Sequence, residues 1–179
     1  MTINTRTMSH VALMTAVLAV IGPFSIPLPF SPVPISLQSF GVHLVAVILG
    51  AKLGTLSYGI YYLLALVGVP VLSQLRGGFS VLVGPTGGYL LGFFLVTLIS
   101  GYAVNRWYKE KLKAQAVMIL GTLLSNVIGT LWLMAQLKLG LKDALIAGFF
   151  PFILGDLLKT ILAFHLGLLI RKAIKKTAY

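Results

Sequence analysis

Apolar runs of membrane-spanning length follow one another along the chain, and charged residues are almost absent from them. Only 9% of the 179 residues are charged, whereas a soluble domain of this size carries about a quarter. A helix needs roughly 20 apolar residues to cross the bilayer core, so the length suits about six crossings. The sequence therefore predicts one integral membrane domain over residues 1–179.

The expected fold is an all-α bundle of six transmembrane helices. Turns rich in glycine, proline or cations separate the apolar runs and place helices at residues 8–22, 37–49, 53–67, 85–104, 115–137 and 151–171. The last helix begins either near Asp143 or afresh at Pro151. No small-residue cleavage motif follows Gly22, so the apolar run after Arg6 is interpreted as a retained first helix.

Two connecting segments are unusual. Residues 23–36 hold five prolines, a density that regular helix does not tolerate. This apolar segment is expected to lie against the membrane surface or to fold back into the protein. Gly68–Gly84 is predicted as a loop with a single cation, Arg76, beside two glycines. Pro85 then opens the next helix, since proline suits the first helical position.

Aromatic and imidazole side chains inside the predicted helices each have two interpretations. Tyr58, Tyr61 and Tyr62 lie close together in the sequence, which favours an aromatic belt at headgroup level over the lining of a pocket. His43 lies near the start of the second helix. A hydrogen-bonded packing role is favoured for His43 over a role in binding.

Cations predict the orientation of the bundle. With six spans, ten lysines and arginines fall on the side of the termini, including Arg6, Lys52 and the basic tail, and three fall on the other side: Arg76, Lys138 and Lys142. The positive-inside rule makes the ten-cation side cytoplasmic. The proline segment, the Arg76 loop and the start of the last helix are then expected outside. The net charge of +11 is thus explained by topology, and no nucleic-acid partner is expected.

Asp156 and Lys159 are the sharpest functional signal, because they interrupt an otherwise apolar run in a chain with only three acids. Three residues apart, they share one face of a helix. Ionisable residues at membrane depth are costly and usually functional. The alternative is an internal ion pair that only locks two helices together.

The sequence carries no enzyme signature. It has no cysteine, hence no thiolate metal site, and it offers no nucleophile with its base and no paired acids inside the membrane. The glycine-rich segment at Gly84–Phe93 lacks the Lys-Ser/Thr end of a Walker A motif, so the chain cannot drive transport with ATP alone. What remains is a pocket for a small ligand that bears N–H and C=O groups and an acidic end.

Four motifs occur in an order that resembles one family. They are PVPISLQSFG at Pro32–Gly41, GAKLG at Gly50–Gly54, GPTGGYLLGF at Gly84–Phe93 and PFILGDLLK at Pro151–Lys159. Together they look like the BioY family, the biotin-binding S-components of energy-coupling factor vitamin transporters. The resemblance covers nearly the whole chain.

The resemblance implies an S-component-like bundle that binds biotin from outside without a cofactor. It also implies a transmembrane coupling protein and two ATPase subunits as partners. The small residues Ala12 and Ala16, one turn apart, resemble the motif by which such subunits dock on the coupling protein. The expected ligand-binding residues are Gln38, Arg76, Gly84, Gly87, Gly88, Tyr89, Asp156 and Lys159. Arg76 stands where the family often has a small or amide residue, and it is assigned to the biotin carboxylate.

Other classes of function stay open on the residues alone. The chain is compatible with an S-component for another small vitamin, with a stand-alone small-solute transporter or channel, and with a membrane assembly factor that has no ligand. The stripe that contains Ala12 and Ala16 is equally compatible with packing inside the chain itself.

Overall fold

The computed structural model describes residues 4–176, and the side chains of residues 4–174. Most of the chain, 78%, is helical. The helices are α1 (Thr5–Ile21), α2 (Gln38–Leu49), α3 (Ala51–Leu66), α4 (Phe79–Val83), α5 (Gly87–Arg106), α6 (Lys111–Leu137), α7 (Leu141–Gly148) and α8 (Phe150–Lys176). Two strands, β1 (Ser25–Leu28) and β2 (Ser31–Ser36), and a short 3-10 turn, η1 (Ser73–Leu75), complete the structure.

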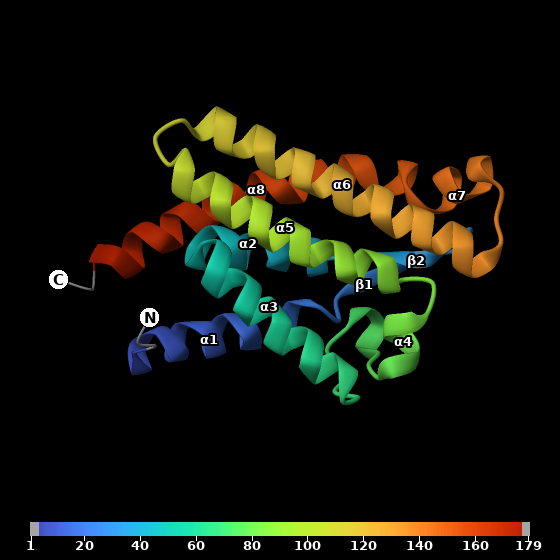
Figure 1. Cartoon of the computed structure of the whole chain (residues 1–179), viewed down its shortest axis with the longest axis horizontal. Helices are drawn as coiled ribbons and strands as arrows, with labels where there is room; N and C mark the ends of the chain where they lie inside the picture. The colour runs from blue at the N-terminus through green and yellow to red at the C-terminus, as the bar shows by residue number, and fades with distance from the viewer. Residues whose placement is uncertain (1–3, 177–179) are drawn as a thin grey trace.

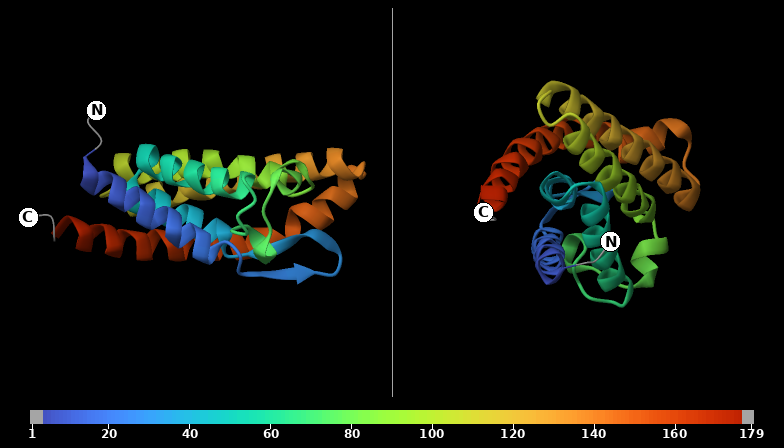
Figure 2. Two further views of the ribbon diagram at one scale, coloured as in Figure 1. Left: turned by 90° about the horizontal axis from the view of Figure 1, so that it is seen from below. Right: turned by 60° about the vertical axis from the view of Figure 1, so that its left-hand side comes forward.

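The long helices run lengthwise through an elongated bundle, with both ends of the chain at one end of it (Figure 1). The β1–β2 hairpin, α4 and α7 lie toward the other end, as the first view in Figure 2 also shows. Helix α2 occupies the middle and contacts α1, α3, α5 and α8. Almost every residue of α2 is buried, which explains why this helix is apolar all round rather than on one stripe.

Three helical stretches of the described chain are long and apolar enough to cross a membrane: Gly87–Arg106, Lys111–Leu137 and Leu141–Ile174. Helices α1 and α2 are apolar but shorter. The 12 residues of α2 extend about 18 Å, less than the ~30 Å of a bilayer core. By length and composition, the described structure therefore supports three of the six crossings predicted from sequence.

The proline-rich segment departs from the all-α prediction. Non-helical backbone was expected there, but the segment forms an antiparallel hairpin in which Ser25 pairs with Ser36 and Leu28 with Ser31. Each strand of a two-stranded hairpin has a free edge, where proline removes no hydrogen bond that the sheet needs. The pairing is irregular between Ile26 and Leu28, around Pro27.

Several predicted boundaries also shift. Helix α5 begins at Gly87 after Thr86 rather than at Pro85, and the predicted loop Gly68–Gly84 contains η1 and α4. Both predicted starts of the last helix occur, as α7 and then α8. The glycine turn between the second and third helices is confirmed, since Gly50 adopts a φ of 80° between α2 and α3, a value that suits glycine.

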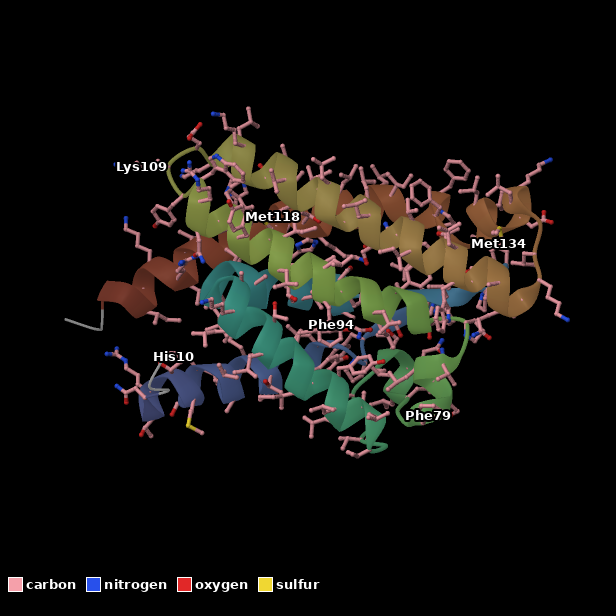
Figure 3. The ribbon with its side chains drawn as sticks, viewed as in Figure 1. His10, Phe79, Phe94, Lys109, Met118 and Met134 are labelled. Carbon is pink, nitrogen blue, oxygen red and sulfur yellow. The ribbon has the colours of Figure 1, made fainter. Side chains whose placement is uncertain are left out.

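Two of the three tyrosines predicted to form a belt at the lipid surface, Tyr58 and Tyr61, lie inside the bundle, so that prediction is wrong for them, whereas Tyr62 is partly exposed. Tyr58 and Tyr61 are completely buried, and their hydroxyls donate to the carbonyls of Leu90 at 2.6 Å and Val71 at 2.8 Å. The Tyr58 ring also packs edge-on against Phe94, 4.8 Å between centroids, between α3 and α5 (Figure 3). The tyrosines therefore tie α3 to α5 and to the loop that follows α3.

Candidate functional site

A pocket opens where the hairpin, the segment after α3 and the starts of α2, α5 and α8 meet. About 630 Å³ of space lies between its walls, open solvent at the mouth included. Its polar lining includes Gln38, Ser73, Arg76, Asp156 and Lys159. The sequence-predicted acid–base pair and loop cation thus line one cavity.

The carboxylate of Asp156 is joined to Lys159 and to α2. Nζ of Lys159 lies 3.1 Å from Oδ1 of Asp156 and 3.3 Å from Oγ of Ser39. The Ser39 hydroxyl donates to the same Oδ1 at 3.0 Å. The side chains of Asp156 and Lys159 are only 9% and 14% exposed, so the ion pair is shielded from solvent while it still borders the pocket.

Helix α6 contributes the remaining contact of this carboxylate. The side-chain amide of Asn126 donates to Oδ2 of Asp156 at 3.0 Å. A carboxylate offers about four lone-pair positions. Three are filled by the Ser39, Lys159 and Asn126 contacts, which leaves one on Oδ2. The ammonium of Lys159, with three hydrogens, likewise keeps one after its contacts with Ser39 and Asp156.

Gln38 presents a donor with no partner. Its carbonyl oxygen accepts from the Ser73 hydroxyl at 3.3 Å, but its Nε2 is buried without an acceptor in the described structure. An unsatisfied buried donor costs about 1–3 kcal/mol. Because Gln38 lines the pocket, a ligand acceptor placed there would remove this cost.

Arg76 stands at the mouth on the segment between η1 and α4. Its guanidinium donates to the side-chain oxygen of Gln74, and the residue lines both the main pocket and a neighbouring cavity of about 460 Å³. Gln74 adopts a left-handed φ of 63°, unusual for a residue with a side chain. Of the three charged residues that line the pocket, Arg76 is the exposed one.

Apolar and aromatic side chains complete the walls, among them Val33, Tyr89, Phe93 and Phe152. The Tyr89 hydroxyl donates to the carbonyl of Gly148 at 2.6 Å. This bond commits the hydroxyl to α7 and leaves the aromatic ring to face the pocket. Tyr89 thus lies at the predicted site through its ring.

The three motif glycines lie elsewhere. Gly87 and Gly88 do not line the pocket. A Cβ on Gly87 would meet the Leu82 carbonyl at 1.9 Å, and one on Gly88 would meet Trp132 at 2.2 Å. Gly84 borders only the neighbouring cavity, and its carbonyl accepts from the Trp132 indole at 2.9 Å. Gly88 therefore permits close packing of α5 against α6, and Gly87 permits close packing of α5 against α4.

A second polar layer lies one helical turn deeper. His43 on α2 contacts Ser100 of α5 at 3.0 Å, Thr122 of α6 at 2.9 Å and Thr160 of α8 at 3.1 Å. The Thr160 hydroxyl also donates to the backbone carbonyl of Asp156 at 2.7 Å. The packing role predicted for His43 is confirmed, since its ring joins four helices beneath the pocket.

The small residues of α1 lie outside the bundle. Ala12 and Ala16 are exposed, whereas Val11, Met14, Thr15 and Leu18 of the same helix are buried. The alternative that this stripe packs inside the chain is therefore wrong. A smooth exposed face remains on α1.

Sequence reasoning missed several pocket residues: Ser39, Ser73, Phe93, Asn126 and Phe152. Ser39 and Asn126 were visible as polar residues in apolar helices, and polar groups at membrane depth are a signal for partners. Nothing in the local sequence links either residue to Asp156, more than a hundred residues from Ser39 and 30 from Asn126.

Comparison with known proteins gives consistent results. Residues 1–176 match the BioY family. Biotin transporter BioY2 of Lactococcus lactis subsp. cremoris (strain MG1363) is 35% identical over 176 residues, 97% of this chain and 96% of that protein. Biotin transporter BioY of Thermotoga maritima is 37% identical over 172 residues, 93% of this chain and 96% of that protein.

A crystal structure of the S-component for biotin from an ECF-type ABC transporter has a similar fold. Its TM-score is 0.84 at 31% identity, over 93% of this chain and 91% of that chain. Together with the three apolar stretches of spanning length, these similarities identify a membrane protein of a transporter family rather than an enzyme family. The chain belongs to the BioY family.

Proposed function

We propose that this chain is the biotin-binding S-component of an energy-coupling factor importer. One observation carries the proposal: the Asp156–Lys159 pair lines a pocket and keeps one lone pair on the carboxylate and one hydrogen on the ammonium without a partner in the described structure. The ureido ring of biotin has two N–H donors and one carbonyl acceptor. That pattern matches a carboxylate and an ammonium held side by side. It also agrees with biotin as the ligand of the similar transporter and of the similar crystal structure.

The ureido ring is assigned to the deep end of the pocket. Oδ2 of Asp156 accepts one ureido N–H, and Lys159 donates toward the ureido carbonyl. Nε2 of Gln38, which lacks an acceptor, supplies a further donor beside them. Each charge-assisted hydrogen bond contributes about 1.5–3 kcal/mol.

The acid tail of biotin is assigned to the mouth. Arg76 meets the carboxylate, and the rings of Tyr89, Phe93 and Phe152 cover the apolar part of the ligand. An arginine fork suits a carboxylate because two parallel N–H donors can bind its two oxygens. The neighbouring cavity, which also contains Arg76, leaves room for the carboxylate and its water.

The mouth is assigned to the outside of the cell and both termini to the cytoplasm. The cation asymmetry between the two ends supports this orientation. Of the helices, α1, α2, α3, α5, α6 and α8 supply the six crossings of a single membrane domain, with the shorter ones completed by flanking segments. The side chains of Lys175 and Lys176, counted in the basic tail, lie outside the described residues.

The partners are a transmembrane coupling protein and two ATPase subunits. The exposed stripe at Ala12 and Ala16 supports docking, because small residues let a helix of another chain approach closely. The sequence contains no Walker A motif, so energy for concentrative uptake comes from the partner subunits.

Labelled biotin tests the proposal directly. Purified protein should bind biotin in preference to a panel of other vitamins, and membranes should accumulate it against a gradient only with the ATPase module. Preferred binding of another vitamin would assign the chain to a different substrate. Accumulation without the module would favour a stand-alone transporter.

A further inference from the structure

A second groove lies at the end of the bundle opposite the ligand pocket. Its walls are the N-terminal part of α1 and the C-terminal part of α8, and its floor is the turn between α2 and α3. Both walls project past this turn at the end where the termini lie (Figures 1 and 2). The groove holds about 590 Å³ of space, including its open side, and it has no part in the proposed biotin site.

Arg171 on the α8 wall is a partly buried cation in a fixed position. Its guanidinium donates to the Val47 carbonyl at 3.1 Å and to the side-chain oxygen of Asn105 at 2.6 Å. These bonds use two of its five N–H donors, and the residue also lines the groove. Because these two hydrogen bonds already hold the guanidinium of Arg171, it loses little conformational freedom when it binds a ligand.

No carboxylate of the described residues balances this charge. Glu110 pairs with Lys113 and Asp156 pairs with Lys159, while Asp143 lies on α7 at the other end (Figure 1). A cation removed from water is costly unless an anion or hydrogen bonds compensate it. Arg171 has only neutral acceptors, so the groove is suited to an anion.

The remaining lining shows what kind of anion fits. Thr7 and His10 add polar groups on the α1 wall, and His10 marks this end of α1 in Figure 3. Leu49, Leu53 and Ile174 make the rest of the surface apolar. A site with a cation and hydroxyl on its walls and an aliphatic floor matches a phosphate joined to a glycerol ester better than a bare, fully hydrated ion.

We propose that this groove binds the phosphate headgroup of an anionic phospholipid. Arg171 holds the phosphate, Thr7 and His10 contact it from α1, and the apolar floor covers the glycerol end of the acyl chains. The position supports a lipid, because the groove lies at the cation-rich end of the chain, which the orientation proposed above puts at the cytoplasmic headgroups. Basic pockets between membrane helices on the cytoplasmic side bind such headgroups in general.

Native mass spectrometry of the full chain in an uncharged detergent tests the proposal. Added phosphatidylglycerol should be retained at a concentration about tenfold lower than diacylglycerol, which lacks the phosphate, as expected for one charge-assisted contact. Arg171→Gln should abolish this preference. Arg106→Gln, which removes an exposed cation at the same end but outside the groove, should change retention by about twofold at most, since exposed charges are screened.

A second variant covers the case in which Arg171→Gln unfolds, which thermal melting would reveal. Leu53→Trp fills the apolar floor without changing charge, and it should also reduce retention of phosphatidylglycerol. Equal losses in Arg171→Gln and Arg106→Gln would indicate diffuse attraction and overturn the proposal. So would displacement of the lipid by inorganic phosphate at a similar concentration. If the Arg171→Gln and Leu53→Trp variants retained lipid normally but assembled less well with the ATPase module, the groove would be a protein interface instead.

Discussion

The side-chain amide of Asn126 donates to Oδ2 of Asp156 at 3.0 Å, so α6 holds the carboxylate that α8 carries. This bond fixes the plane of the carboxylate and leaves its remaining lone pair available. The amide of Asn126 also lines the pocket. The carboxylate proposed to bind the ureido ring is therefore positioned before any ligand arrives, which would lower the entropic cost of binding.

Asp156→Asn should weaken biotin binding about tenfold or more, because it removes a charge-assisted bond worth about 1.5–3 kcal/mol. Equilibrium binding of labelled biotin measures the effect. Asp143→Asn is the matched control, since Asp143 is exposed on α7 outside the pocket. Unchanged affinity in a folded Asp156→Asn variant would leave the ion pair a structural role only.

Arg76→Ala should weaken biotin more than biotin amide, which lacks the carboxylate charge. The reason is that the guanidinium at the mouth is assigned to the acid tail alone. Competition binding with the two ligands gives the ratio. Lys142→Ala removes an exposed cation from α7 without touching the pocket and should leave the ratio unchanged. Equal losses for both ligands in Arg76→Ala would refute the assignment.

Gln38→Leu should stabilise the ligand-free protein or leave it unaffected, yet weaken biotin binding. The substitution removes a buried donor that has no acceptor, and such a donor costs folding free energy unless a ligand pairs with it. Thermal melting without ligand and equilibrium binding separate the two effects. A drop in melting temperature with full affinity would contradict this explanation.

Replacing both Ala12 and Ala16 with Trp should abolish ATP-driven uptake while biotin binding by the isolated protein survives. Both residues are exposed, so the bulky rings disturb a surface rather than the core. Leu120→Trp on α6 is the control, because Leu120 is also exposed but lies on another helix. Joint loss of binding and uptake in the α1 variant would count against docking through this face.

Hydrogen exchange should slow in the β1–β2 hairpin and in Gly68–Gly84 when biotin binds. Both segments line the pocket and carry much exposed backbone, and closure over the ligand would exclude water and strengthen the polar contacts. Exchange in the middle of α6 should not change. Equal protection of the hairpin with and without biotin would indicate a site that is already closed.

The predictable features are those that depend on residues close together in the sequence. Asp156 and Lys159 meet because they are three residues apart on one helix. Helices α5, α6 and α8 follow from long runs of mostly apolar residues. Proline density indicated a break in the helices, but it could not reveal that the prolines would occupy free edges of a hairpin.

Features that depend on distant contacts were not predictable. Tyr58 and Tyr61 look like interfacial residues until Leu90 and Val71 provide carbonyls for their hydroxyls. Gly88 suggests a place where a ligand could come close to the backbone, but in the structure Trp132 packs against it. In each case the partner comes from another part of the chain, so only the packing of helices decides the role.

The layer of bonds around His43 separates the pocket from the other end of the bundle. Its ring contacts Ser100, Thr122 and Thr160, all buried, and thereby joins four helices below the pocket. A molecule moving from the pocket along the bundle axis would have to part several of these contacts at about 1–3 kcal/mol each. In this conformation the described residues therefore oppose passage through the bundle, and a ligand would leave by the opening through which it entered.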